Sequence, residues 1–221
     1  MKKLSLIALE KCLPTIELIK EHPFNKELAD GSLPMSKFAY YVEQDTLFLR
    51  DFTRSLAFLA SKVPPKFTGD FLSFSEYILM AEQEVVHNFF RKTYQLEEIG
   101  KLTPATLSYT SYILYKSSMA PVEVGIASVL PCFWIYKIVG DSITKNTDKA
   151  SQNPYQQWID AYSGQGYSDT VQRVIDIFDE IALSTSDEVQ QLMLDAFYKG
   201  TVLEWHFWND AYNKTAFDSL C

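Results

Sequence analysis

Two carboxylates stand in otherwise apolar helical rows of the sequence. A row with steps of four and three residues contains one acid, Asp45: Phe38, Val42, Asp45, Leu49, Phe52, Leu56, Leu59. A second row contains Glu204: Met193, Phe197, Gly200, Glu204, Phe207, Ala211. Rows of this period face a helix-packed core, where an unpaired carboxylate costs several kcal/mol. Each acid is therefore expected to be paired, protonated or used, and two such acids in an apolar cavity can serve as hydrogen-bond anchor and general acid/base.

Cys132 is a candidate nucleophile within an apolar segment, Val129 to Tyr136. A lone cysteine in a buried helix is usually a small apolar side chain, and a reactive thiol needs an electropositive or hydrogen-bonded setting. Pro131 directly before it perturbs the helix and can free backbone groups beside the sulfur. The sequence leaves both interpretations open. With Cys12 and Cys221 as the other cysteines, the chain has too few for a disulfide framework.

Tyr109 and Tyr162 are the tyrosines best placed to contact a ligand, because both lie in or beside expected loops. An aromatic ring there can stack on a flat heterocycle while its hydroxyl orients that ring. The other tyrosines are interpreted as ordinary core or surface residues.

A metal site is not expected. Glu84 and His87 form a Glu-x-x-His step of the kind used in di-iron carboxylate bundles, which need a second copy. Neither His22 nor His206 has an acid three residues before it. Nothing in the sequence supports His22 as a haem ligand, and no cofactor is predicted.

Charge and composition narrow the partners. The chain of 221 residues has a formal charge of −8 and no basic block, so neither a nucleic acid nor an anionic membrane is an expected partner. The apolar window Ala120 to Val139 contains two prolines, a glutamate and a lysine, so it is predicted to be a buried core helix rather than a membrane span. No signal peptide is recognised. We expect a cytoplasmic protein that binds a small neutral or cationic molecule.

Scarce glycine and proline and long amphipathic rows predict an all-α chain, residues 1–221 forming a single domain of roughly eight helices. Thr106 to Lys116 has some strand propensity, but no second strand is available to pair with it, so it is predicted to be helical. Ser163 to Gly166 is predicted to be a loop, and Thr185 to Glu188 a capping box. The first expected helix is Leu4 to Lys20, broken by His22-Pro23; a short helix then ends at Asp30, and after a turn at Gly31 to Pro34 a long helix reaches Lys62. The other expected helices are Gly69 to Leu96, Thr106 to Lys116, Pro121 to Lys145, Pro154 to Tyr162, Ser168 to Leu183 and a last helix to Tyr212.

Five motifs in fixed order give the chain a family resemblance over essentially its whole length. They are Gln44-Asp45-x-x-Phe48-Leu49, Ser108-Tyr109-Thr110-Ser111, Leu130-Pro131-Cys132-x-Trp134-x-Tyr136, Tyr155-x-x-Trp158-Ile159-x-x-Tyr162 and Glu204-x-x-Phe207-Trp208. Together they resemble the TenA family, also called thiaminase II or aminopyrimidine aminohydrolase. The resemblance implies a haem-oxygenase-like helical bundle without bound haem, usually a homotetramer.

The resemblance also implies an activity: hydrolysis of 4-amino-5-aminomethyl-2-methylpyrimidine to its hydroxymethyl counterpart and ammonia, in thiamin salvage. Many members also cleave thiamin to the hydroxymethylpyrimidine and the thiazole alcohol. By the same resemblance, Asp45 bonds the aminopyrimidine edge, Cys132 adds to the ring, Glu204 transfers protons, and Tyr109 and Tyr162 position ring and cysteine.

Phe48 is the departure from the pattern, because the family commonly has a second active-site tyrosine there. Stacking survives this change but a hydroxyl hydrogen bond is lost. Two other functions remain open from the sequence: an oxygenase or oxidase on the same scaffold, and a non-catalytic thiamin- or pyrimidine-binding protein.

Overall fold

The computed structural model describes residues 2–80, 92, 101–146 and 153–217, and helices are the regular elements among these residues. The all-α prediction is confirmed, and the segment with mixed propensity, Thr106 to Lys116, lies inside a helix. The described part of the chain has nine helices, in line with the roughly eight expected: α1 (Leu4–Lys20), α2 (Pro23–Asp30), α3 (Met35–Lys62), α4 (Pro65–Tyr77), α6 (Pro104–Met119), α7 (Val122–Asn146), α8 (Gln156–Ser163), α9 (Gln165–Leu183) and α10 (Asp187–Asn213).

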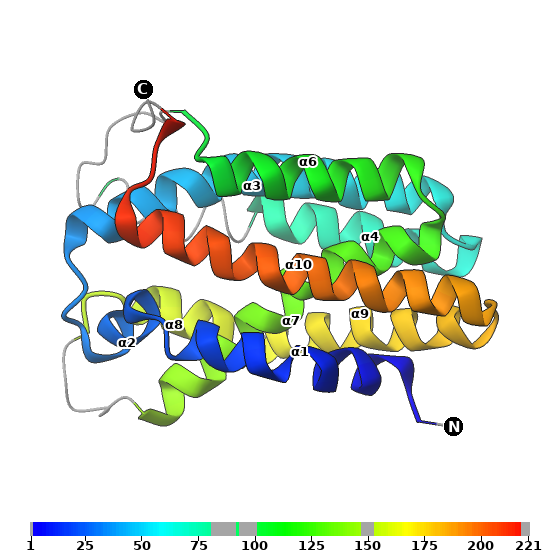
Figure 1. Cartoon of the computed structure of the whole chain (residues 1–221), viewed down its shortest axis with the longest axis horizontal. Coiled ribbons are helices and arrows are strands. Elements are labelled where there is room, and N and C mark those ends of the chain that lie inside the picture. The colour runs from blue at the N-terminus through cyan, green and yellow to red at the C-terminus, as the bar shows by residue number, and fades with distance from the viewer. Residues whose placement is uncertain (1, 81–91, 93–100, 147–152, 218–221) are drawn as a thin grey trace.

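The long helices form a bundle in which α7 and α10 make the most extensive contact. Figure 1 shows α10 running along the molecule, with α3 and α6 on one side of it and α1 and α9 on the other. Helix α3 packs against α4, α6 and α10, while α7 also contacts α6, α8 and α9. Both apolar rows found in the sequence are buried, including Asp45 and Glu204.

Helix α7 is buried, as its apolar window predicted. Val122–Thr144 is long and apolar enough to cross a membrane, but 72% of its most apolar window is buried inside the fold. It packs instead against α10, α9, α6 and α8.

Two glycines allow close helix crossings at the segments that carry Cys132 and Tyr162. A Cβ atom at Gly200 of α10 would lie 2.8 Å from Pro131 Cγ of α7, and one at Gly140 of α7 would lie 2.9 Å from the carbonyl oxygen of Tyr162. Glycine therefore lets α10 approach α7 beside Cys132, and lets the end of α8 approach α7.

Three predicted boundaries were wrong. Helix α4 begins at Pro65 rather than Gly69, because proline at the first helical position has a backbone angle already suited to a helix. The rest of that predicted helix, to Leu96, falls largely on residues 81–91 and 93–100, which lie outside the described residues, as do Glu84, His87 and Cys221.

The second correction concerns Ser163 to Gly166, predicted as a loop. Helix α8 ends at Ser163 and α9 begins at Gln165, so Gly164 alone separates them. The third concerns α10, whose N-cap is Ser186 rather than the first residue of the proposed box. The Ser186 side chain accepts a hydrogen bond from the Val189 amide at 3.4 Å.

Candidate active site

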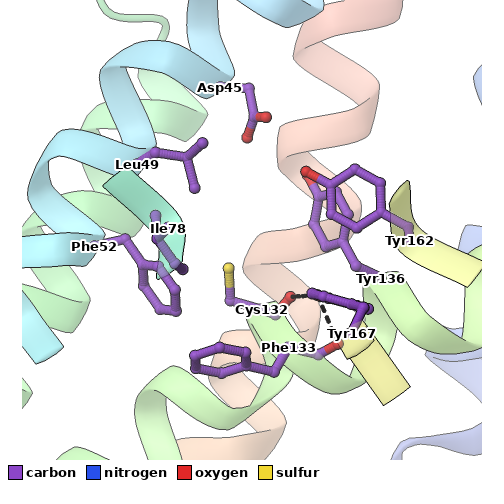
Figure 2. A pocket seen from close by; sticks show the side chains of 9 residues that line it. All are labelled: Asp45, Leu49, Phe52, Ile78, Cys132, Phe133, Tyr136, Tyr162 and Tyr167. Carbon is purple, nitrogen blue, oxygen red and sulfur yellow. Dashed lines mark hydrogen bonds between the residues drawn. The ribbon is translucent and has the colours of Figure 1, made fainter. Parts of the chain in front are cut away.

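A narrow hollow lies among α3, α7, α8, α9 and the end of α4. Figure 2 shows its lining, with Asp45 entering from α3 and the Cys132 sulfur pointing into the hollow from α7. The structure therefore brings together three of the predicted site residues, Asp45, Cys132 and Tyr162. The full lining is Asp45, Leu49, Phe52, Ile78, Cys132, Phe133, Tyr136, Tyr162 and Tyr167.

Asp45 is an acid in an aromatic setting and is 2% exposed. The Tyr41 hydroxyl, one helical turn earlier on α3, donates a hydrogen bond to Asp45 Oδ2 at 3.2 Å. Leu49, one turn later, lines the same hollow, because residues four apart share a helix face. Helix α3 thus presents a single carboxylate to an otherwise apolar part of the wall.

Cys132 follows Pro131 inside α7 and is 7% exposed. Because proline has no N–H, α7 lacks the helical hydrogen bond that residue 131 would otherwise donate. Tyr167 from α9 holds the same stretch of backbone: its hydroxyl donates to the Phe133 carbonyl at 3.0 Å and to the Cys132 carbonyl at 3.4 Å. These hydrogen bonds, seen in Figure 2, fix the backbone that carries the thiol.

Glu204 and Tyr109 form a buried pair just outside the lining. The Tyr109 hydroxyl donates to Glu204 Oε1 at 2.7 Å, and Glu204 is 1% exposed. Burial raises the pKa of Glu204 to about 8; the Tyr109 hydrogen bond lowers it and the charge of Asp45 raises it further. Glu204 is therefore largely protonated at neutral pH.

Both Glu204 and Cys132 affect the electrostatics of Tyr109. Its pKa is raised well above 10, first by burial and then by electrostatic interaction with Glu204 and Cys132. The Tyr109 hydroxyl thus stays protonated and lies within electrostatic range of both groups.

Phe48 does not line the hollow. It is buried, with its ring centroid 4.8 Å from that of Tyr109, 5.6 Å from Phe52 and 5.7 Å from Phe207. Its ring therefore supports the wall from behind.

Several lining residues were not predicted as site residues. Tyr136 lies four residues after Cys132 and so shares its helix face; that spacing could have identified it. Burial raises its pKa well above 10, and the neighbouring Tyr41 and Asp45 add to the shift. Tyr167 and Ile78 reach the hollow from other helices and had no local signal.

His22 has a structural role: it caps a helix and packs against aromatic rings. Its Nδ1 accepts a hydrogen bond from the Phe24 amide at 3.2 Å, which caps α2. Its ring meets those of Trp205 and Tyr212 edge-on, and burial lowers its pKa. Among the described residues, no group of three His, Cys, Asp or Glu side chains is placed to hold a metal ion.

A helical bundle with an acid, a thiol and tyrosines around a narrow hollow defines a class of proteins that bind small molecules inside the fold. Within that class, residues 10–214 match the model of the TENA/THI-4/PQQC family. The chain belongs to this family, which confirms the resemblance found in the sequence.

Individual relatives agree with this membership. Over 200 residues the chain is 32% identical to the aminopyrimidine aminohydrolase of Bacillus subtilis strain 168, covering 87% of this chain and 83% of that protein. A TenA homologue from Pyrococcus furiosus superposes with a TM-score of 0.89 at 19% identity, over 94% of this chain and 99% of the other. A Shewanella denitrificans OS217 domain with a heme oxygenase-like fold gives 0.71 at 15% identity, over 97% and 94%. The predicted haem-oxygenase-like fold is confirmed.

Proposed function

We propose that this protein hydrolyses 4-amino-5-aminomethyl-2-methylpyrimidine to 4-amino-5-hydroxymethyl-2-methylpyrimidine and ammonia, a step of thiamin salvage. The observation that carries the proposal is the convergence of Asp45 and Cys132, 87 positions apart in sequence, on one aromatic-walled hollow. The lining has the chemistry to bind a flat ring with polar edges, since tyrosine rings can cover its faces while a carboxylate bonds its edge. The name of the Bacillus subtilis relative supports the same substrate class.

Asp45 is the proposed substrate anchor. Its carboxylate faces the hollow (Figure 2) and can accept a hydrogen bond from the 4-amino group. An analogue without that group would leave a buried carboxylate unpaired, which is the kind of loss that gives strong discrimination.

Cys132 is the proposed nucleophile. Its thiolate forms an Sγ–C bond to a carbon of the pyrimidine ring, and the ring loses its aromaticity. The electron pair released into the ring then expels the protonated amine from the exocyclic methylene as ammonia. Water adds its oxygen to that methylene and gives up a proton, and the Sγ–C bond breaks to restore the aromatic ring and the thiolate.

Glu204 is the proposed proton carrier. With its pKa raised to about 8, it holds a proton at neutral pH that it can donate to the departing amine, and the resulting carboxylate can accept a proton from the attacking water. Tyr109 holds this carboxyl group and, with Tyr162, positions the ring and the thiol.

The proposal extends to thiamin, which carries the same aminopyrimidine with a thiazolium as the leaving group. Release of the thiazole measures thiamin cleavage.

We further propose a cytoplasmic homotetramer. Exposed leucines on α1 are consistent with contacts between copies: Leu6, Leu13 and Leu18. Light scattering after size-exclusion chromatography measures the number of copies in the assembly.

The first test replaces Cys132 with alanine and measures ammonia release from the aminomethylpyrimidine. We expect turnover to fall by at least about 10³-fold, because the covalent route is lost. Cys12→Ala is the matched control, since Cys12 is also a buried thiol but does not line the hollow; it should keep wild-type turnover. Near wild-type turnover by Cys132→Ala would remove the thiol from the mechanism, and metal analysis of the wild type would then test an oxidase.

A further inference from the structure

Two fully buried side chains behind the hollow, Tyr41 of α3 and Trp158 of α8, are connected to Asp45 by hydrogen bonds. The Trp158 indole Nε1 donates to the Tyr41 hydroxyl at 3.1 Å, and that hydroxyl donates to Asp45 Oδ2 at 3.2 Å. Both side chains have no solvent exposure, and neither lines the hollow.

The direction of these hydrogen bonds follows from donor chemistry. An indole N–H can only donate, and a tyrosine hydroxyl has a single hydrogen. Since the Tyr41 oxygen accepts from Trp158, its own hydrogen is available for Asp45. Trp158 thereby selects the hydroxyl rotamer that holds the carboxylate.

The Tyr41 ring is held in place by packing. It stacks on Trp208 with centroids 5.2 Å apart and planes 6° apart. Trp158 and Phe207 meet it edge-on, at 6.2 Å and 6.1 Å. With the ring fixed on these sides, its hydroxyl has little freedom to move away from Asp45.

Trp158 also contacts an aromatic wall of the hollow. Its ring lies 4.6 Å from that of Tyr162, which lines the hollow. The same indole therefore supports both the wall from α8 and, through Tyr41, the carboxylate from α3.

We propose that Tyr41 and Trp158 are positioning residues that orient the Asp45 carboxylate toward the aminopyrimidine edge and so set substrate affinity. This inference rests on the proposed function. Tyr41 and Trp158 touch neither substrate nor reacting atoms; they act through Asp45. Their loss consequently affects KM rather than the steps at Cys132 and Glu204.

The test is Tyr41→Phe, which removes the hydroxyl and keeps the ring. We expect KM for the aminomethylpyrimidine to rise about 10-fold with kcat within about 2-fold of wild type, the size expected when a hydrogen bond to a charged group is lost. Tyr112→Phe is the matched control, because it removes another tyrosine hydroxyl donor, a partly buried one that donates to the Ala196 carbonyl at 3.3 Å, without a link to Asp45. It should leave KM unchanged.

A double-mutant cycle distinguishes positioning from a general packing effect. If Tyr41 acts through Asp45, Tyr41→Phe should change KM by less than about 2-fold when Asp45→Asn is already present. Trp158→Phe leaves the Tyr41 hydroxyl in place and should raise KM about 3-fold, an effect also lost beside Asp45→Asn. Circular dichroism and thermal midpoints establish that each variant is folded.

Two results would overturn the inference: a Tyr41→Phe enzyme with the KM of Tyr112→Phe, or a KM rise that persists in full beside Asp45→Asn. Should Tyr41→Phe not fold, Trp158→Phe with unchanged KM overturns it equally. A wild-type protein that releases no ammonia contradicts the proposed function itself, so the two failures are distinguishable.

Discussion

Asp179 and Glu204 are carboxylates buried where two helices meet, and the protein holds them in different ways. Where α9 meets α1, Asp179 accepts hydrogen bonds from the Ser5 amide at 2.9 Å and the Ser5 hydroxyl at 2.7 Å, with Lys3 Nζ at 3.6 Å. Where α10 meets α6, the Glu204 carboxyl group accepts a hydrogen bond from the Tyr109 hydroxyl.

The difference shows how a buried acid that stabilises the fold can be distinguished from one suited to proton transfer. Asp179 accepts a hydrogen bond from the Ser5 amide in the first turn of α1, where backbone N–H groups have no partner within the helix. The Lys3 ammonium group lies beside it. Glu204 has a neutral hydroxyl in an apolar, aromatic setting, and burial raises its pKa to about 8. A proton that the protein holds near neutral pH is useful for catalysis.

In the comparison of these two acids, the largest expected effect is on catalytic activity when Glu204 is replaced. Glu204→Gln should lower kcat/KM for ammonia release about 10²–10³-fold, because glutamine transfers no proton. Folding should be retained, since the amide oxygen can still accept from Tyr109. Steady-state kinetics and a thermal melt check both parts; turnover within 2-fold of wild type would assign Glu204 to structure.

The next effect is on the pH dependence of stability. The folded-state pKa of Glu204, about 8, lies above its ordinary value of 4.5, so the folded state binds more protons between these values. The contribution of Glu204 to stability is fully present below pH 4.5 and is lost as pH rises through about 8, on the order of a few kcal/mol. Urea unfolding at pH 5, 7 and 9 should show this loss in the wild type and a smaller one in Glu204→Gln. Parallel profiles for the two proteins would contradict it.

The smallest effect is on stability at the α1 contact. Asp179→Asn should lower the free energy of unfolding by about 2 kcal/mol, because charge-assisted hydrogen bonds to Ser5 are weakened, while kcat/KM stays within 2-fold. Asp176→Asn is the control: this half-exposed acid lies 3.9 Å from Lys3 and should change stability by less than about 0.5 kcal/mol. A loss of activity in Asp179→Asn would erase the distinction between the two acids.

The sequence by itself determined the long helices and the burial of Asp45 and Glu204, but not the burial of Asp179. A period of 3.6 residues is local, so the rows through Asp45 and Glu204 could be read directly and both are buried. The same locality places Tyr41 and Leu49 one turn on either side of Asp45, and Tyr136 one turn after Cys132. Helix ends were predicted less well, because α4 begins at Pro65 where the sequence predicted a start at Gly69.

The tertiary structure decided which of these faces meet. That Cys132 and Asp45 share one hollow depends on how α3 and α7 pack, and the approach of α10 to Cys132 depends on Gly200 fitting against Pro131. The contacts of Tyr167 with the Cys132 backbone and of Trp158 with Tyr41 join residues 35 and 117 positions apart. Sequence spacing fixes neighbours within one helix, whereas contacts between helices depend on the packing of the whole core.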